Sequence, residues 1–111
     1  MNIQFETERL RVECNNDKLL KKRYGARMAG VIRRRLDDLS AAENLEAMGS
    51  LPGRCHELKG DRGGQLSLDL ENPFRLIFVP SDFPPAVKPE GGIDRKNVRS
   101  VVIIGIEDTH E

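Results

Sequence analysis

The chain has 111 residues, of which 38% are hydrophobic and 32% charged, and its 18 basic and 18 acidic residues give a formal net charge of zero. This predicts one domain, 1–111, with a modest core, and excludes a whole-molecule attraction for nucleic acid, so any such binding must come from a local patch. No apolar run approaches the roughly 20 residues that span a bilayer, and no secretory stretch opens the chain. We therefore expect a cytoplasmic protein with no membrane partner.

The first residues are predicted to be extended. Ile3 and Phe5 alternate with polar neighbours, which is typical of a short strand. Leu10, Val12 and Cys14 alternate in the same way and favour a second extended piece.

From Asp17 the hydrophobic period changes to that of a helix, and Asn16 or Asp17 is suited to cap its first turn. Apolar residues then recur every three or four positions and mark one buried helix face. They are Leu20, Tyr24, Met28, Ile32, Leu36 and Leu39. Gly25 interrupts the run, which predicts two helices with a bend there, the second ending near Leu39 and followed by a turn or short helix over 41–48.

After the glycine and proline residues of 49–53 the period becomes two. Leu66, Leu68 and Leu70 alternate with polar residues, segment 74–79 is apolar apart from Arg75, and 98–106 is rich in valine and isoleucine. The sequence thus predicts three strands, with 74–79 in the middle of the sheet and 80–92 as a Pro/Gly-rich loop. Helices followed by strands indicate an α+β fold, with the helices on one face of a mainly antiparallel sheet.

Eight cations without an acid lie between positions 18 and 35. Such a run is commonly a helix face exposed to solvent. The alternative interpretation is a binding surface for phosphates or for an acidic partner. The cations are Lys18, Lys21, Lys22, Arg23, Arg27, Arg33, Arg34 and Arg35.

Two short segments combine the residue types needed to cleave a phosphodiester. Segment 54–62 holds His56, Lys59 and two arginines, and His110 follows the apolar run before 107. These are the two histidines of the chain. Imidazole moves protons near neutral pH, and guanidinium and ammonium groups hold phosphate charge. Neither Cys14 nor Cys55 has metal-ligand or disulfide-framework spacing, so no metal or other cofactor is expected.

Arg75 stands inside an otherwise apolar strand, where a buried guanidinium needs a partner. One interpretation is an ion pair with a carboxylate such as Asp69 or Asp108. The other is a phosphate clamp that faces the same pocket as His56.

The segment 51–70 (LPGRCHELKGDRGGQLSLDL), followed by 72–78 (NPFRLIF) and by a Val/Ile strand ending in 107–110 (EDTH), resembles the HigB-like toxins of the RelE/ParE superfamily. In the helical half, 23–25 (RYG) and 34–39 (RRLDDL) are similar too. The resemblance implies a RelE-like α+β fold and a bacterial type II toxin. It implies an mRNA endonuclease that acts in the ribosomal A site, needs no metal and leaves a 2′,3′-cyclic phosphate. A helix-turn-helix, HigA-like antitoxin would be its partner.

Residue by residue, the resemblance gives catalytic roles to four side chains and substrate-binding roles to four others. The catalytic ones are His56, Lys59, Asp108 and His110, and the substrate-binding ones are Arg54, Arg62, Arg75 and Thr109. Thr109 departs from the tyrosine common in the family. The sequence leaves open which histidine is the acid and which the base. Two other functions also stay open: a ParE-like inhibitor of DNA gyrase, and a weakened toxin that only binds its antitoxin.

Overall fold

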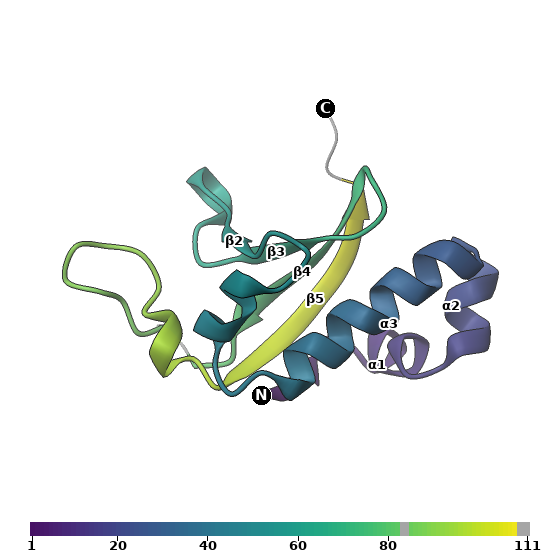
Figure 1. Cartoon of the computed structure of the whole chain (residues 1–111), viewed down its shortest axis with the longest axis horizontal. Helices are drawn as coiled ribbons and strands as arrows, with labels where there is room; N and C mark the ends of the chain where they lie inside the picture. The colour runs from purple at the N-terminus through teal and green to yellow at the C-terminus, as the bar shows by residue number, and fades with distance from the viewer. Residues whose placement is uncertain (83–84, 109–111) are drawn as a thin grey trace.

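The computed structural model describes residues 1–82 and 85–108, and these form an α+β fold (Figure 1). Within these residues the helices are α1 (Glu8–Cys14), α2 (Asp17–Tyr24) and α3 (Ala26–Ala41). The strands are β1 (Asn2–Phe5), β2 (His56–Glu57), β3 (Leu66–Asp69), β4 (Phe74–Pro80) and β5 (Ser100–Asp108). Short 3₁₀ turns cover Leu45–Ser50, Gly60–Arg62 and Arg95–Asn97.

The described strands form one sheet in the order β1-β5-β4-β3-β2, in which β1 runs parallel to β5 and the other neighbours are antiparallel. The predicted strands, with 74–79 in the middle of the sheet, are therefore confirmed. Leu76, Ile77 and Phe78 of β4 are fully buried, as a central strand requires. The segment 85–97 projects from the end of the sheet away from α2 (Figure 1).

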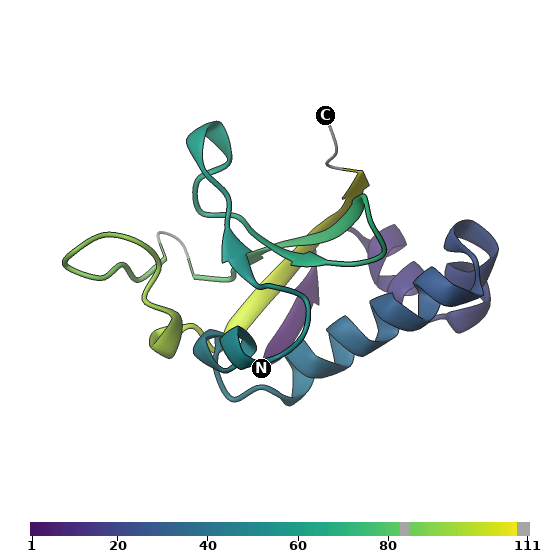
Figure 2. The ribbon, with the colours of Figure 1, turned by 45° about the horizontal axis from the view of Figure 1, so that its top comes forward.

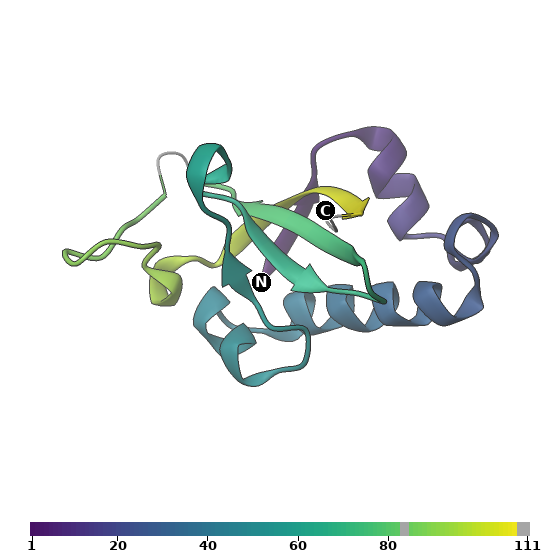
Figure 3. The same cartoon turned by 90° about the horizontal axis from the view of Figure 1, so that it is seen from above.

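The helices pack against one face of the sheet, as predicted. Figures 2 and 3 show α3 running along the sheet and α2 at the end where α3 begins, while α1 lies between β1 and α2. Apolar side chains at helical spacing on α2 and α3 meet strand residues in one buried cluster. The cluster includes Leu20, Met28, Ile32, Leu36 and Leu39 from the helices and Leu66, Leu68, Leu76, Phe78, Val101 and Ile103 from the strands.

The bend between α2 and α3 lies at the predicted glycine. Gly25 has φ +85°, a backbone conformation that residues other than glycine rarely adopt. It ends α2 and directly precedes α3. Asn16 caps α2, since its side chain accepts a hydrogen bond from the backbone N–H of Leu19 at 3.2 Å.

The prediction of an extended piece through Leu10, Val12 and Cys14 is wrong, because these residues belong to α1. The hydroxyl of Thr7 accepts a hydrogen bond from Leu10 N–H at 3.1 Å and so caps the helix. Glu8 in the first turn pairs with Arg11. A cap and an acidic first turn were therefore stronger signals than the alternation of three apolar residues.

Cys14 gives the fold a pH-dependent component of stability. The thiol is fully buried, and burial raises its pKa from 9.0 to about 11. Above pH 9 the unfolded chain ionises this thiol while the folded chain does not. We predict that the free energy of unfolding falls by about 1.4 kcal/mol per pH unit between pH 9 and 11 from this group. Urea unfolding of wild type and Cys14→Ala across this range checks it, and equal slopes in the two proteins would refute it.

Candidate functional site

The face of the sheet away from the helices carries a polar cluster drawn from four neighbouring strands. In the strand register His56 lies opposite Ser67, and Arg75 lies between Asp69 and Glu107. Side chains opposite each other, or two apart on one strand, share a face. The residues that alternate with Ser67, Asp69 and Arg75 along β3 and β4 are Leu66, Leu68 and Leu76, and these point into the core. The alternation of β3 and β4 therefore places the polar residues on the face away from the helices, which we call the open face, although Ser67 within it is fully buried.

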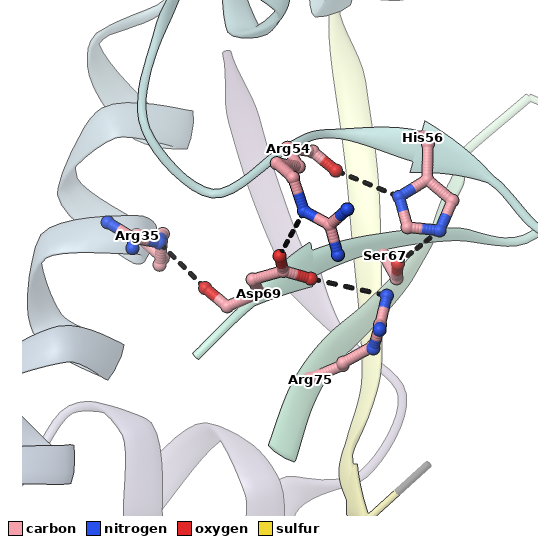
Figure 4. A network of polar contacts seen from close by, with 6 residues as sticks. All are labelled: Arg35, Arg54, His56, Ser67, Asp69 and Arg75. Carbon is pink, nitrogen blue, oxygen red and sulfur yellow. Dashed lines mark hydrogen bonds and ion pairs between the residues drawn. The ribbon is translucent and has the colours of Figure 1, made fainter. Parts of the chain in front are cut away.

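Asp69 is the centre of this cluster (Figure 4). Its Oδ2 accepts a hydrogen bond from Arg54 Nε at 2.5 Å, and its Oδ1 lies 3.2 Å from Arg75 Nη1 in an ion pair. Its backbone carbonyl accepts from Arg35 Nε at 2.9 Å. The carboxylate raises the pKa of Arg54, chiefly through the hydrogen bond. One aspartate thus binds three arginines that come from a helix, a loop and the next strand.

The hydrogen bonds of His56 determine its neutral tautomer. Nδ1 lies 2.9 Å from the backbone carbonyl of Arg54, and a carbonyl only accepts, so Nδ1 carries the proton. Nε2 is then an acceptor, and the buried Ser67 hydroxyl lies 3.4 Å from it. The ring is thus oriented on one side and keeps an unprotonated nitrogen on the other.

A second arginine–carboxylate pair stands beside the first. Arg62 Nη1 and Nη2 each donate to one oxygen of Glu107 at 2.9 Å, and Arg62 Nε donates to Gln65 at 2.9 Å. The hydrogen bond to Glu107 is the main cause that raises the pKa of Arg62. This paired, planar geometry fixes the guanidinium beside the end of β5.

The backbone of Arg54 is strained. Its φ of +48° is the one positive value among the non-glycine residues that the structure describes. For residues other than glycine this left-handed region costs roughly 1–2 kcal/mol, and such strain is concentrated at functional sites. This strained residue directly follows Gly53, and its own carbonyl accepts the hydrogen bond from His56 Nδ1.

We therefore predict that Arg54→Gly leaves the fold as stable as wild type or more stable, although it removes an ion pair. The relief of strain, roughly 1 kcal/mol or more, should match the small contribution of so exposed a pair. Thermal melting measures this, and Arg54→Ala, which keeps the strain, is the control. A glycine variant less stable than the alanine variant would contradict the prediction.

The other predicted site residues occupy different positions. Lys59 is exposed and, within residues 1–82 and 85–108, its ammonium group has no hydrogen bond or ion pair. Asp108 ends β5 opposite Phe74, so strand alternation places it on the other face from Glu107. Thr109 and His110 lie outside the described residues. The ion-pair interpretation of Arg75 with Asp69 is confirmed, and its phosphate-binding role remains a prediction.

The basic run of 18–35 lies on α2 and α3, which Figure 1 shows on the other side of β5 from β2, the strand that holds His56. Four of its arginines have polar partners: Arg23 with Glu13, Arg27 with Glu71, Arg33 with Asp37, and Arg35 with the Asp69 carbonyl. Its charge is thus not part of the polar face, apart from Arg35 at its edge.

Sequence reasoning missed two members of the cluster, Ser67 and Glu107, and it predicted Asp69 as a partner of Arg75 but not of Arg54. The signal was available in part, because Ser67 and Asp69 alternate with buried leucines along β3. In the described part of the chain no three His, Cys, Asp or Glu side chains are grouped to hold a metal ion. No helix there is long and apolar enough to cross a membrane.

Known structures identify the architecture. No protein-family model matches the chain, and no curated protein matches its sequence. A solved YoeB/ParE toxin from Agrobacterium tumefaciens matches 99% of this chain and 100% of its own, with a TM-score of 0.58 and 15% sequence identity. The chain has a RelE/ParE-like toxin fold. At this identity the similarity establishes the fold alone, and the function must be argued from side chains.

Proposed function

We propose that this protein is the toxin of a type II toxin–antitoxin system, similar to HigB, and that it cleaves mRNA on the ribosome. One observation carries the proposal. On a RelE/ParE-like fold, an imidazole of defined tautomer shares the open face of the sheet with the guanidinium groups of Arg54 and Arg75, which Asp69 pairs (Figure 4). Proton transfer and phosphate stabilisation are the two requirements for RNA cleavage by the 2′-hydroxyl.

In the proposed reaction the 2′-hydroxyl attacks the adjacent phosphorus, and the bond from phosphorus to the 5′-oxygen breaks. His56 Nε2 takes the proton of the hydroxyl, since its tautomer leaves this nitrogen unprotonated. The acid role then falls to His110, which protonates the leaving oxygen. The products are a 2′,3′-cyclic phosphate and a 5′-hydroxyl.

The cations of the face have donors left for the phosphate. Arg54 and Arg75 each use one nitrogen on Asp69, and a guanidinium carries five N–H donors. Lys59 is exposed, and its ammonium group is unpaired among the described residues. These groups, with Arg62, would stabilise the extra negative charge of the transition state. Asp108 and Thr109 would orient His110 and the substrate.

The proposal also defines partners and location. A helix-turn-helix antitoxin would neutralise the protein in the cytoplasm, and the ribosome would present the message. The net charge is zero, so the ribosome has to be recognised through local cations instead of the whole molecule. No cofactor is needed by this reaction.

Expression in bacteria without the antitoxin tests the proposal against its two alternatives. Growth arrest with messages cut inside translated regions, seen by primer extension, supports it. Arrest with intact messages and inhibited gyrase would show a ParE-like activity instead. With neither arrest nor cleavage, co-purification with the product of a neighbouring helix-turn-helix gene would leave antitoxin binding as the function.

A further inference from the structure

Asp69 is built into the sheet more firmly than a surface counterion. Its side chain is 29% exposed, and its Oδ1 is buried and accepts no hydrogen bond from the described residues, although Arg75 lies 3.2 Å away. Its backbone N–H donates to the carbonyl of Gly53 at 2.7 Å, and its carbonyl accepts from Arg35. Both the main chain and the side chain of Asp69 are therefore held.

The same residue fixes the loop that carries Arg54. Gly53 directly precedes Arg54, and a Cβ at Gly53 would lie 2.8 Å from Arg35 Nε. Helix α3, the loop and β3 thus meet at a point where only glycine fits. Asp69 holds the backbone next to Arg54 through its N–H and the guanidinium of Arg54 through its carboxylate.

One carboxylate also brings two like charges together. The Arg54 and Arg75 guanidinium groups would repel each other without an anion between them. Asp69 takes one nitrogen from each, and the remaining donors of both have no partner among residues 1–82 and 85–108. The two arginine side chains differ in solvent exposure, which is 71% for Arg54 and 26% for Arg75. Arg75 is thus the inner, fixed member and Arg54 the outer one.

We infer that Asp69 is a positioning residue, which orients Arg54 and Arg75 toward one phosphate on the open face of the sheet. The inference rests on the proposed function and adds to it a residue that does not touch the substrate. An oriented pair of donors lowers the barrier because it needs no rearrangement when charge develops. A carboxylate that only neutralised the arginines would instead weaken RNA binding and slow cleavage.

Asp69→Asn separates these two roles, because asparagine keeps the shape and offers only one acceptor oxygen. We expect kcat to fall on the order of 10- to 100-fold. Binding of a 2′-O-methyl RNA that cannot be cleaved should stay unchanged or tighten, since the variant has one negative charge fewer. Asp37→Asn, which removes the partner of Arg33 on α3, is the matched control and should cleave like wild type. Cleavage by Asp69→Asn at the wild-type rate or faster would overturn the inference.

Hydrogen exchange of arginine Nε–H groups, followed by NMR, gives a second test that does not depend on cleavage. In wild type Arg54 Nε–H should exchange more slowly than that of the exposed Arg34 on the same molecule, and Asp69→Asn should remove the difference. Equal exchange of Arg54 and Arg34 in wild type would overturn the inference even where the variant does not fold. A wild type that cleaves no message refutes the proposed function, and this exchange then decides whether Asp69 holds Arg54.

Discussion

Replacing His56 with alanine is expected to lower the rate of message cleavage by ~10²–10⁴-fold, the usual contribution of one proton-transfer group. Imidazole is the side chain that most often transfers protons in catalysis, and His56 is the one histidine among the described residues. It is also held in one tautomer by the carbonyl of Arg54. Single-turnover cleavage of a translated message by the purified variant measures the loss.

The fold should survive this change, because His56 is half-buried on a two-residue edge strand and lies outside the apolar cluster. Melting of His56→Ala within a few degrees of wild type is therefore the control. His56→Gln adds a second one, since its amide can keep a hydrogen bond to the carbonyl but cannot take a proton. Cleavage by either variant at the wild-type rate would remove His56 from the mechanism.

Replacing Phe78 with alanine is expected to lower the free energy of unfolding by roughly 3–5 kcal/mol. Phe78 is fully buried on the central strand β4 and faces the helices. Truncation leaves a cavity between the sheet and the helices, and neither layer can move to fill it. Because domains are stable by only about 5–15 kcal/mol, much of the protein should unfold at moderate urea concentrations.

Urea unfolding measures this effect, and Val87→Ala is the control. Val87 is 65% exposed in the segment that projects from the sheet, so its truncation should change stability by less than about 0.5 kcal/mol. The folded fraction of Phe78→Ala should keep the cleavage rate per molecule, since His56 lies on the other face of the sheet. A loss below about 1 kcal/mol would contradict the packing of helices on β4.

The parts of the fold that hydrophobic period determines could be predicted from the sequence. The helix face from Leu20 to Leu39, its interruption at Gly25 and the central strand around Phe78 all follow from local spacing. Helix α1 could not be predicted in this way, because its seven residues are too few to show a helical period. The N-cap residue Thr7 is the feature that favours a helix there.

The candidate site was only partly predictable. His56 and Arg75 stand out by residue type, so the sequence is enough to identify them. The bridging role of Asp69 and the pairing of Arg62 with Glu107 depend on strand register, and a shift of one residue would move each to the other face. The alternation within one strand indicates which residues share a face, but it does not specify which residues of the neighbouring strand lie opposite them.

We propose that the open face around His56 cleaves RNA through the 2′-hydroxyl. The most direct test of this proposal is the chemistry of the cut ends in a reconstituted translation reaction with purified protein, in wild type and His56→Ala. We expect wild type to cut the ribosome-bound message and leave a 2′,3′-cyclic phosphate and a 5′-hydroxyl, and His56→Ala to leave it almost intact. An uncut message with wild type, or ends bearing a 5′-phosphate, would contradict the account.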